Sequence, residues 1–126
     1  MKIPLIPERG APPQGPYSPG MKATGTMIFV SAQGPLDPAT GQIVGETVQE
    51  QAERVFENIR LVLEAGGATL ADVVRTTVFL KNPEDFAAMN QVYERTFPPP
   101  YPARTTVSGV GGRLLVFADA IAVVEG

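Results

Sequence analysis

The chain has 126 residues, which suits one domain, and it contains no cysteine and no histidine. These absences exclude disulfide frameworks, thiol nucleophiles, histidine-based triads and histidine metal sites. The net charge is −3 and the basic residues are scattered, so the basic patch typical of a nucleic-acid binder is missing. No apolar run has membrane-spanning length and residues 1–9 lack a signal sequence, so we expect a cytoplasmic protein with no membrane partner.

Residues 10–20 are dominated by proline and glycine, which exclude a regular helix or a central strand. Because this stretch carries Tyr17 and lies near the N-terminus of a single-domain chain, we expect it to wrap over the surface. The short apolar run 27–32 predicts a strand, and the prolines and glycines of residues 33–41 predict a turn region.

Residues 47–65 are the clearest helix of the sequence. Thr47 and Glu50 have the spacing of a capping box, and Gly66-Gly67 is a typical helix end. Apolar residues recur at alternating steps of four and three, which places one stripe on the helix: Val48, Ala52, Val55, Ile59 and Val62. Charged residues fill the opposite side, as expected of a solvated face.

Residues 73–80 are β-branched and apolar, which predicts a strand. Asn82 and Pro83 predict the start of a second helix, and the three prolines of residues 98–100 predict its end. The expected buried face of that helix consists of Phe86, Met89, Val92 and Tyr93.

Residues 103–107 predict a short strand, and 114–124 a long apolar strand of the kind that is covered on both faces. The order of elements predicts a single α+β domain over residues 1–126, with two helices on one face of a mixed sheet. No third long helix is available for the other face, so a partner subunit is the simplest cover.

Arg104 and Asp119 are the two unusual charges of this region. Asp119 is the only charge within residues 114–124. If residues 103–107 and 114–124 form a hairpin, Arg104 lies opposite Phe117 with Asp119 as its diagonal neighbour. Such a pair is either a structural ion pair or part of a functional site, and the spacing alone leaves both readings open.

Several blocks of sequence, in this order, resemble the Rid (YjgF) family of imine and enamine deaminases along nearly the whole chain. They are residues 15–18 (GPYS), 29–33 (FVSAQ), 35–41 (PLDPATG), 76–80 (TTVFL), 85–93 (DFAAMNQVY), 102–107 (PARTTV) and 119–122 (DAIA). The resemblance implies a chorismate-mutase-like fold and a homotrimer with sheets facing inward and clefts between subunits. It also implies hydrolysis of 2-imino acids, among them 2-iminopropanoate and 2-iminobutanoate, to 2-keto acids and ammonia, without cofactor or metal.

Site residues follow from the same resemblance. It implies that Arg104 binds the substrate carboxylate, that Asp119 orients the attacking water, and that Tyr17 lines the cleft. Further substrate contacts fall on Ser31 and on the backbone amides of Ala32 and Thr106. This chain departs from the family at three of these positions, with Thr106 where cysteine is frequent, Asp119 where glutamate is usual and Ala32 where glycine is frequent. Phe86 and Tyr93 are expected to belong to the core.

Two other functions compete with the deaminase. The same arginine could serve a non-catalytic trimer that binds 2-keto acids or acts as a chaperone-like module. RNA cleavage, an activity attributed to some relatives, is disfavoured by the acidic charge, the missing basic patch and the missing histidine.

Overall fold

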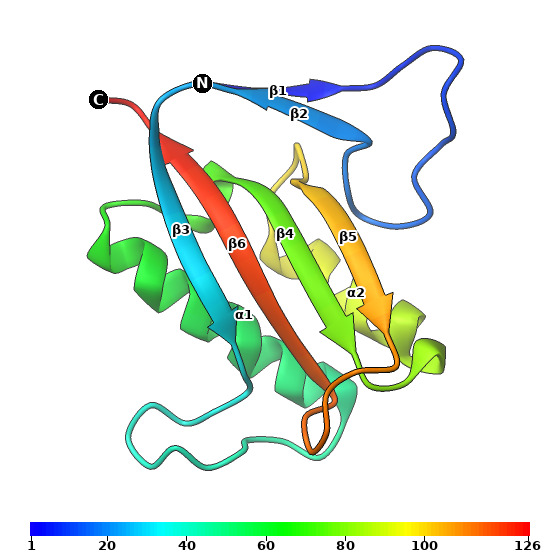
Figure 1. Ribbon diagram of the computed structural model, residues 1–126, viewed down its shortest axis with the longest axis vertical. Helices are drawn as coiled ribbons and strands as arrows, with labels where there is room; N and C mark the ends of the chain where they lie inside the picture. Colours follow the sequence, from blue (N-terminus) through cyan, green and yellow to red (C-terminus); the bar gives the residue numbers. More distant parts are fainter.

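The computed structural model describes residues 1–126 and has at its centre a four-stranded sheet in the order β3-β6-β4-β5. Its strands are β3 (Thr26–Gln33), β4 (Val73–Leu80), β5 (Ala103–Ser108) and β6 (Val116–Val124). Two helices, α1 (Val48–Ala65) and α2 (Phe86–Thr96), lie on the same side of this sheet (Figure 1). The α+β architecture expected from the sequence is thus present, and neither helix combines the length and apolarity required to cross a membrane.

Local signals placed the long helix correctly and the second helix with an offset. At the start of α1 the Thr47 hydroxyl accepts from the Glu50 amide at 3.1 Å, and Glu50 accepts in return from the Thr47 amide. The prediction for the second helix is wrong by one turn. Residues Pro83–Asp85 form a 3-10 turn, α2 begins only at Phe86, and the Asn82 side chain makes no capping hydrogen bond.

The hairpin considered for residues 103–107 and 114–124 does not form. β5 pairs with β4 in parallel, and β4 lies between β5 and β6. The glycine-rich loop after β5 passes over the end of β4, where the Val110 amide donates to the Leu80 carbonyl oxygen at 3.2 Å. This crossing puts the almost entirely apolar β6 between two neighbouring strands and leaves β5, which carries Arg104, at the edge.

A hairpin absent from our sequence expectations begins the chain. Strands β1 (Lys2–Leu5) and β2 (Gly20–Ala23) pair antiparallel as a separate two-stranded sheet (Figure 1). The proline-rich segment connects them and passes the start of β5, where Ser18 forms a bridge with Ala103. The expectation that this segment wraps over the body of the domain is confirmed.

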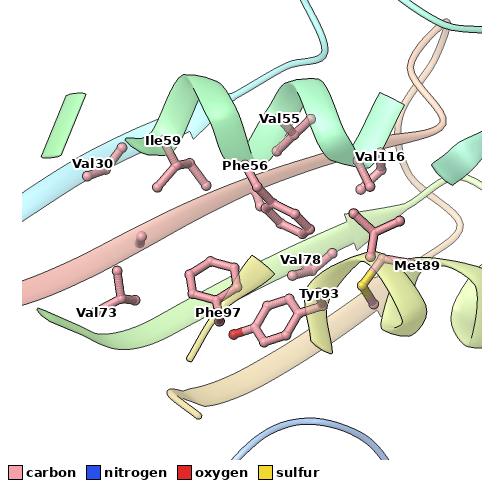
Figure 2. Packing of buried hydrophobic residues seen from close by; sticks show 14 of the residues in the cluster. Val30, Val55, Phe56, Ile59, Val73, Val78, Met89, Tyr93, Phe97 and Val116 are labelled. Carbon is pink, nitrogen blue, oxygen red and sulfur yellow. The ribbon is translucent and has the colours of Figure 1, made fainter. Parts of the chain in front are cut away.

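The core lies between the sheet and the two helices. Phe56 from α1 and Tyr93 from α2 contact Phe97 and each other, with ring centroids 4.4 to 5.5 Å apart (Figure 2). All three side chains are buried. Burial of such rings is a main source of the stability of a domain of this size.

The opposite sheet face, here called the open face, has no cover within the chain. Along β6 buried residues alternate with half-buried ones, so a covered side faces the helices and the other side does not. Phe79 and Phe117 stack on the open face with ring centroids 4.6 Å apart, and Phe29 on β3 is 68% exposed. As expected from the lack of a third long helix, the chain itself covers only one face of the strand predicted at residues 114–124.

Candidate functional site

Arg104 is the second residue of β5 and points toward the helix side of the sheet, where it is only 8% exposed. Three aromatic rings surround its guanidinium carbon: Tyr93 at 4.8 Å, Tyr17 at 5.0 Å and Phe86 at 5.6 Å, measured to the ring centroids. Two of the rings come from α2 and the third from the proline-rich segment. Together they form an aromatic cage around a single cation.

The charge of Arg104 has no counter-ion in the chain. No carboxylate forms an ion pair with it, and its Nε, Nη1 and Nη2 atoms are buried without a hydrogen-bond partner. Burial lowers the pKa of the Arg104 guanidinium, and the neighbouring Tyr93 and Tyr17 oppose that shift. A buried cation with free N–H donors is costly unless an anion completes it, so this arrangement is suited to binding a carboxylate or another small anion.

The proline-rich segment carries Tyr17 to the arginine through contacts with the residues just before β5. The Ser18 amide donates to the Pro102 carbonyl oxygen at 3.0 Å, and the Ser18 hydroxyl donates to the carbonyl oxygen of Tyr101. The Tyr17 hydroxyl in turn accepts from the Gln14 amide at 2.9 Å. These bonds hold the segment against the strand that carries Arg104.

Gly15 allows this close approach because it has no side chain. A Cβ atom at this position would lie 2.8 Å from the Asn90 Nδ2 atom and 3.3 Å from the Arg104 Nη2 atom. The first distance is shorter than real Cβ contacts, so any larger residue would displace the amide of Asn90 or the segment itself.

Asn90 also belongs to this region, although sequence reasoning did not single it out. Its Oδ1 atom is buried without a partner, as are the nitrogens of Arg104. Phe86, Asn90 and Tyr93 are spaced four and three residues apart, so they occupy one face of α2. An asparagine within an apolar helical stripe was the available sequence signal. The assignment of Phe86 and Tyr93 to the core alone missed their contact with Arg104.

The six residues predicted from the resemblance fall into two groups in the structure. Thr106 lies two residues beyond Arg104 on the same face of β5, so Tyr17, Arg104 and Thr106 form one group, here called the arginine half-site. Ser31 and Ala32 lie in β3 and Asp119 lies in β6.

A β-bulge joins the second group. Val30 pairs with Ala120 and Gln33 with Ala118, so Ser31 and Ala32 together face Asp119 across the β3–β6 ladder. Ser31 and Ala32 are exposed, and Asp119 is half-buried. One Asp119 carboxylate oxygen accepts from the Thr77 amide at 3.0 Å. We call Ser31, Ala32 and Asp119 the bulge half-site.

The two half-sites do not meet within one chain. Asp119 pairs with Thr77 and Arg104 with Thr76, so the two side chains point to opposite faces of the sheet. Strands β3 and β5 are separated by three strand spacings, about 14 Å. A structural ion pair between Arg104 and Asp119, one of the two interpretations that the spacing left open, is therefore absent from the single chain.

Comparisons with known proteins give a consistent picture. The family model described as endoribonuclease L-PSP matches residues 8–123. A RutC family protein of Pyrococcus abyssi is 46% identical over 123 residues, covering 96% of both chains. A 2-iminobutanoate/2-iminopropanoate deaminase of Dermatophagoides farinae is 36% identical over 107 residues, which are 85% of this chain and 80% of the relative. The crystal structure of RidA from an Antarctic Psychrobacter superposes with a TM-score of 0.74 at 32% identity, covering 97% and 99% of the two chains.

Proposed function

The chain belongs to the endoribonuclease L-PSP family, also called the Rid or YjgF family, and on that premise we propose that it hydrolyses 2-imino acids and their enamine tautomers to 2-keto acids and ammonia. The observation that carries the proposal is the buried, unpaired guanidinium of Arg104. A 2-imino acid bears a carboxylate beside its reacting carbon. Two parallel hydrogen bonds from Arg104 would bind that carboxylate and fix the position of the neighbouring C=N bond.

The reaction requires little of the protein beyond positioning. An imine is electrophilic, especially when protonated, so water can add to the imine carbon without a strong nucleophile. As the water oxygen bonds to carbon, one water proton passes to the imine nitrogen and gives a carbinolamine. The C–N bond then breaks, the remaining hydroxyl proton moves to the departing nitrogen, and the products are ammonia and a 2-keto acid. In this proposal Asp119 orients the water through its second carboxylate oxygen, and Tyr17 lines the substrate side of Arg104.

A complete site needs residues from two copies of the chain. We propose that the arginine half-site of one subunit faces the bulge half-site of the next in a homotrimer, with Ser31 and the Ala32 and Thr106 amides contacting the substrate. The separation of the half-sites within one chain supports this arrangement, because one small substrate cannot span both. The uncovered open face supports it as well. In a closed ring of identical contacts, each subunit would supply its arginine half-site to one site and its bulge half-site to the neighbouring site.

The test of the activity couples a threonine dehydratase, which releases 2-iminobutanoate, to this protein and follows the appearance of 2-ketobutyrate. We expect the wild type to accelerate keto-acid release and Arg104→Ala to abolish that acceleration while remaining folded. Acceleration that survives in Arg104→Ala would contradict the carboxylate-binding role. A folded wild type without any acceleration would contradict the deaminase proposal for this substrate.

The shared site has a test of its own. Arg104→Ala damages only the arginine half-site and Asp119→Ala only the bulge half-site, so each variant alone should be inactive. When the two are co-expressed, about a quarter of the sites in randomly mixed trimers combine two intact halves. We therefore expect part of the wild-type rate to return. A mixture as inactive as its components would place both residues in the site of a single subunit.

Ligand binding without turnover is the alternative that the same geometry supports, since an unpaired arginine also suits a 2-keto acid sensor. Calorimetric binding of 2-ketobutyrate together with an unchanged rate of imine hydrolysis would favour that function over catalysis. RNA cleavage has no comparable support, because the candidate site contains one buried cation and the chain has a net charge of −3.

A further inference from the structure

We propose that Tyr93, a residue of the hydrophobic core, is a positioning residue for Arg104: its ring holds the guanidinium in place while leaving every N–H donor free for the ligand. The inference rests on the proposed binding of a substrate carboxylate by Arg104. It assigns to the aromatic cage a role that an acidic side chain fills around most buried arginines.

Tyr93 is the most firmly held of the three rings. It is fully buried and has the shortest distance to the guanidinium carbon, 4.8 Å. Its hydroxyl is hydrogen-bonded to the Thr76 hydroxyl at 2.9 Å, and its ring stacks on Phe97 with centroids 4.4 Å apart. Phe56 contacts it edge-on at 5.5 Å (Figure 2). The ring is therefore fixed both at its hydroxyl end and on its sides.

The attachment of Tyr93 also sets its register with the arginine. Thr76 pairs directly with Arg104 in the β4–β5 ladder. The hydroxyl of Tyr93 is therefore bonded to the strand neighbour of Arg104, and its ring lies against Arg104 itself. By contrast, Tyr17 comes from a loop and Phe86 is only half-buried at the first turn of α2. Tyr93 is the ring whose position the sheet itself determines.

A ring serves this purpose where a carboxylate would not. An aspartate or glutamate beside Arg104 would accept its N–H groups in the same bidentate geometry that a substrate carboxylate requires, and would neutralise the charge that attracts it. The face of an aromatic ring attracts the cation through its quadrupole and occupies no N–H donor. This explains why a buried arginine has three aromatic neighbours and yet three unpaired nitrogens.

The test changes the electrostatics of the ring and keeps its shape. Position 93 is first converted by Tyr93→Phe and then occupied by phenylalanines carrying an increasing number of ring fluorines, which weaken the attraction of the ring for a cation. The dissociation constant for 2-ketobutyrate is measured by calorimetry on the full-length protein. We expect Tyr93→Phe to bind within about threefold of the wild type, and affinity to fall steadily by about tenfold across the series.

Phe97 is the matched control, because it is equally buried and stacks on Tyr93 but does not lie over Arg104. The same fluorinated residues at position 97 should leave the dissociation constant for 2-ketobutyrate unchanged. In the kinetics with 2-iminobutanoate, KM should rise for the series at position 93 and not for the series at position 97, while kcat changes at neither position. The inference would be overturned if affinity fell equally with fluorination at both positions, or did not fall at position 93. Imine hydrolysis by the wild type would in that case still support the deaminase. A slope at position 93 in a protein without imine hydrolysis would overturn the deaminase and keep the role of Tyr93. Folded wild-type protein that neither binds 2-ketobutyrate nor accelerates imine hydrolysis would overturn both.

Discussion

The two faces of the four-stranded sheet differ in how much of their apolar surface one chain can cover. On the helix side, Phe56, Tyr93 and Phe97 are buried and pack at defined angles. On the open face, Phe79 and Phe117 stack on each other, and Phe29 is mostly exposed. The difference shows that one chain covers the helix side of its sheet and leaves the open face uncovered. The two half-sites are divided in the same way, since Arg104 lies on the helix side and Asp119 on the open face.

The strongest test of this comparison removes one ring from each face. We expect Phe56→Ala to lower the free energy of unfolding by about 3 to 5 kcal/mol at any protein concentration, because it leaves a cavity among packed rings. Phe29→Ala should lower stability only through the part that depends on protein concentration, because its exposed ring would be buried only in the proposed trimer. Urea unfolding at several protein concentrations measures both. Equal and concentration-independent losses would show that the two faces do not differ.

A pH-dependent test isolates the helix side. Burial raises the pKa of Tyr93 to about 12, with the Thr76 hydrogen bond opposing the shift. Unfolded tyrosine loses its proton near pH 10, so the folded state binds more protons between these values and the free energy of unfolding falls as pH rises. This contribution to the free energy of unfolding is fully present below about pH 10. Roughly 2 to 3 kcal/mol of it is lost by pH 12. Urea titrations from about pH 8 upward should show this loss in the wild type and not in Tyr93→Phe; a loss of equal size in both would refute the assignment.

On the open face, Asp119→Ala removes the acceptor of the Thr77 amide. We expect a loss of about 1 to 2 kcal/mol, because a hydrogen bond to an ionised group contributes more than a neutral one and this carboxylate is only half-buried. Asp119→Asn keeps an acceptor and should recover most of that stability without recovering imine hydrolysis. Thermal unfolding and the coupled assay measure the two properties. An active Asp119→Asn variant would show that the charge is not required.

The smallest expected effect lies outside both faces, at the start of α1. Thr47→Ala removes the hydroxyl that accepts from the Glu50 amide and should cost about 1 kcal/mol. Thr47→Ser keeps an acceptor and is the matched control. Because neither half-site involves this turn, KM for the imine should not change in either variant. A change in KM would mean that α1 and the site are more tightly linked than the two-face comparison allows.

Elements with local signals could be predicted from the sequence. The Thr47–Glu50 box predicted the start of α1, and the β-branched run of residues 73–80 matches β4. Strand pairing could not be predicted, because it is decided by segments far apart in the sequence. β5 is adjacent in sequence to β6, yet it pairs with β4, because the apolar β6 gains more burial between two strands than at an edge. The short strands of the N-terminal hairpin contain Pro4 and lack a clear alternation, so no local pattern marked them.

The candidate site shows the same limit. The resemblance named Arg104, Tyr17 and Thr106 together with the bulge residues, but it carried no information on which of them one chain brings together. Phe86 and Tyr93 have the spacing of an ordinary core stripe, and only the fold shows that this stripe faces a cation. Asn90 was the one polar exception in that stripe.

The unpaired guanidinium of Arg104 also bears on how this chain can change over evolutionary time. A buried cation without hydrogen bonds lowers the stability of the empty protein, and an apolar side chain of similar size in its place would fold more favourably. Mutation tends to drift toward such replacements wherever nothing opposes them. Under the proposed function, binding of an anionic ligand is what opposes this drift. A lineage that lost the ligand would then be expected to lose Arg104 before it lost the fold.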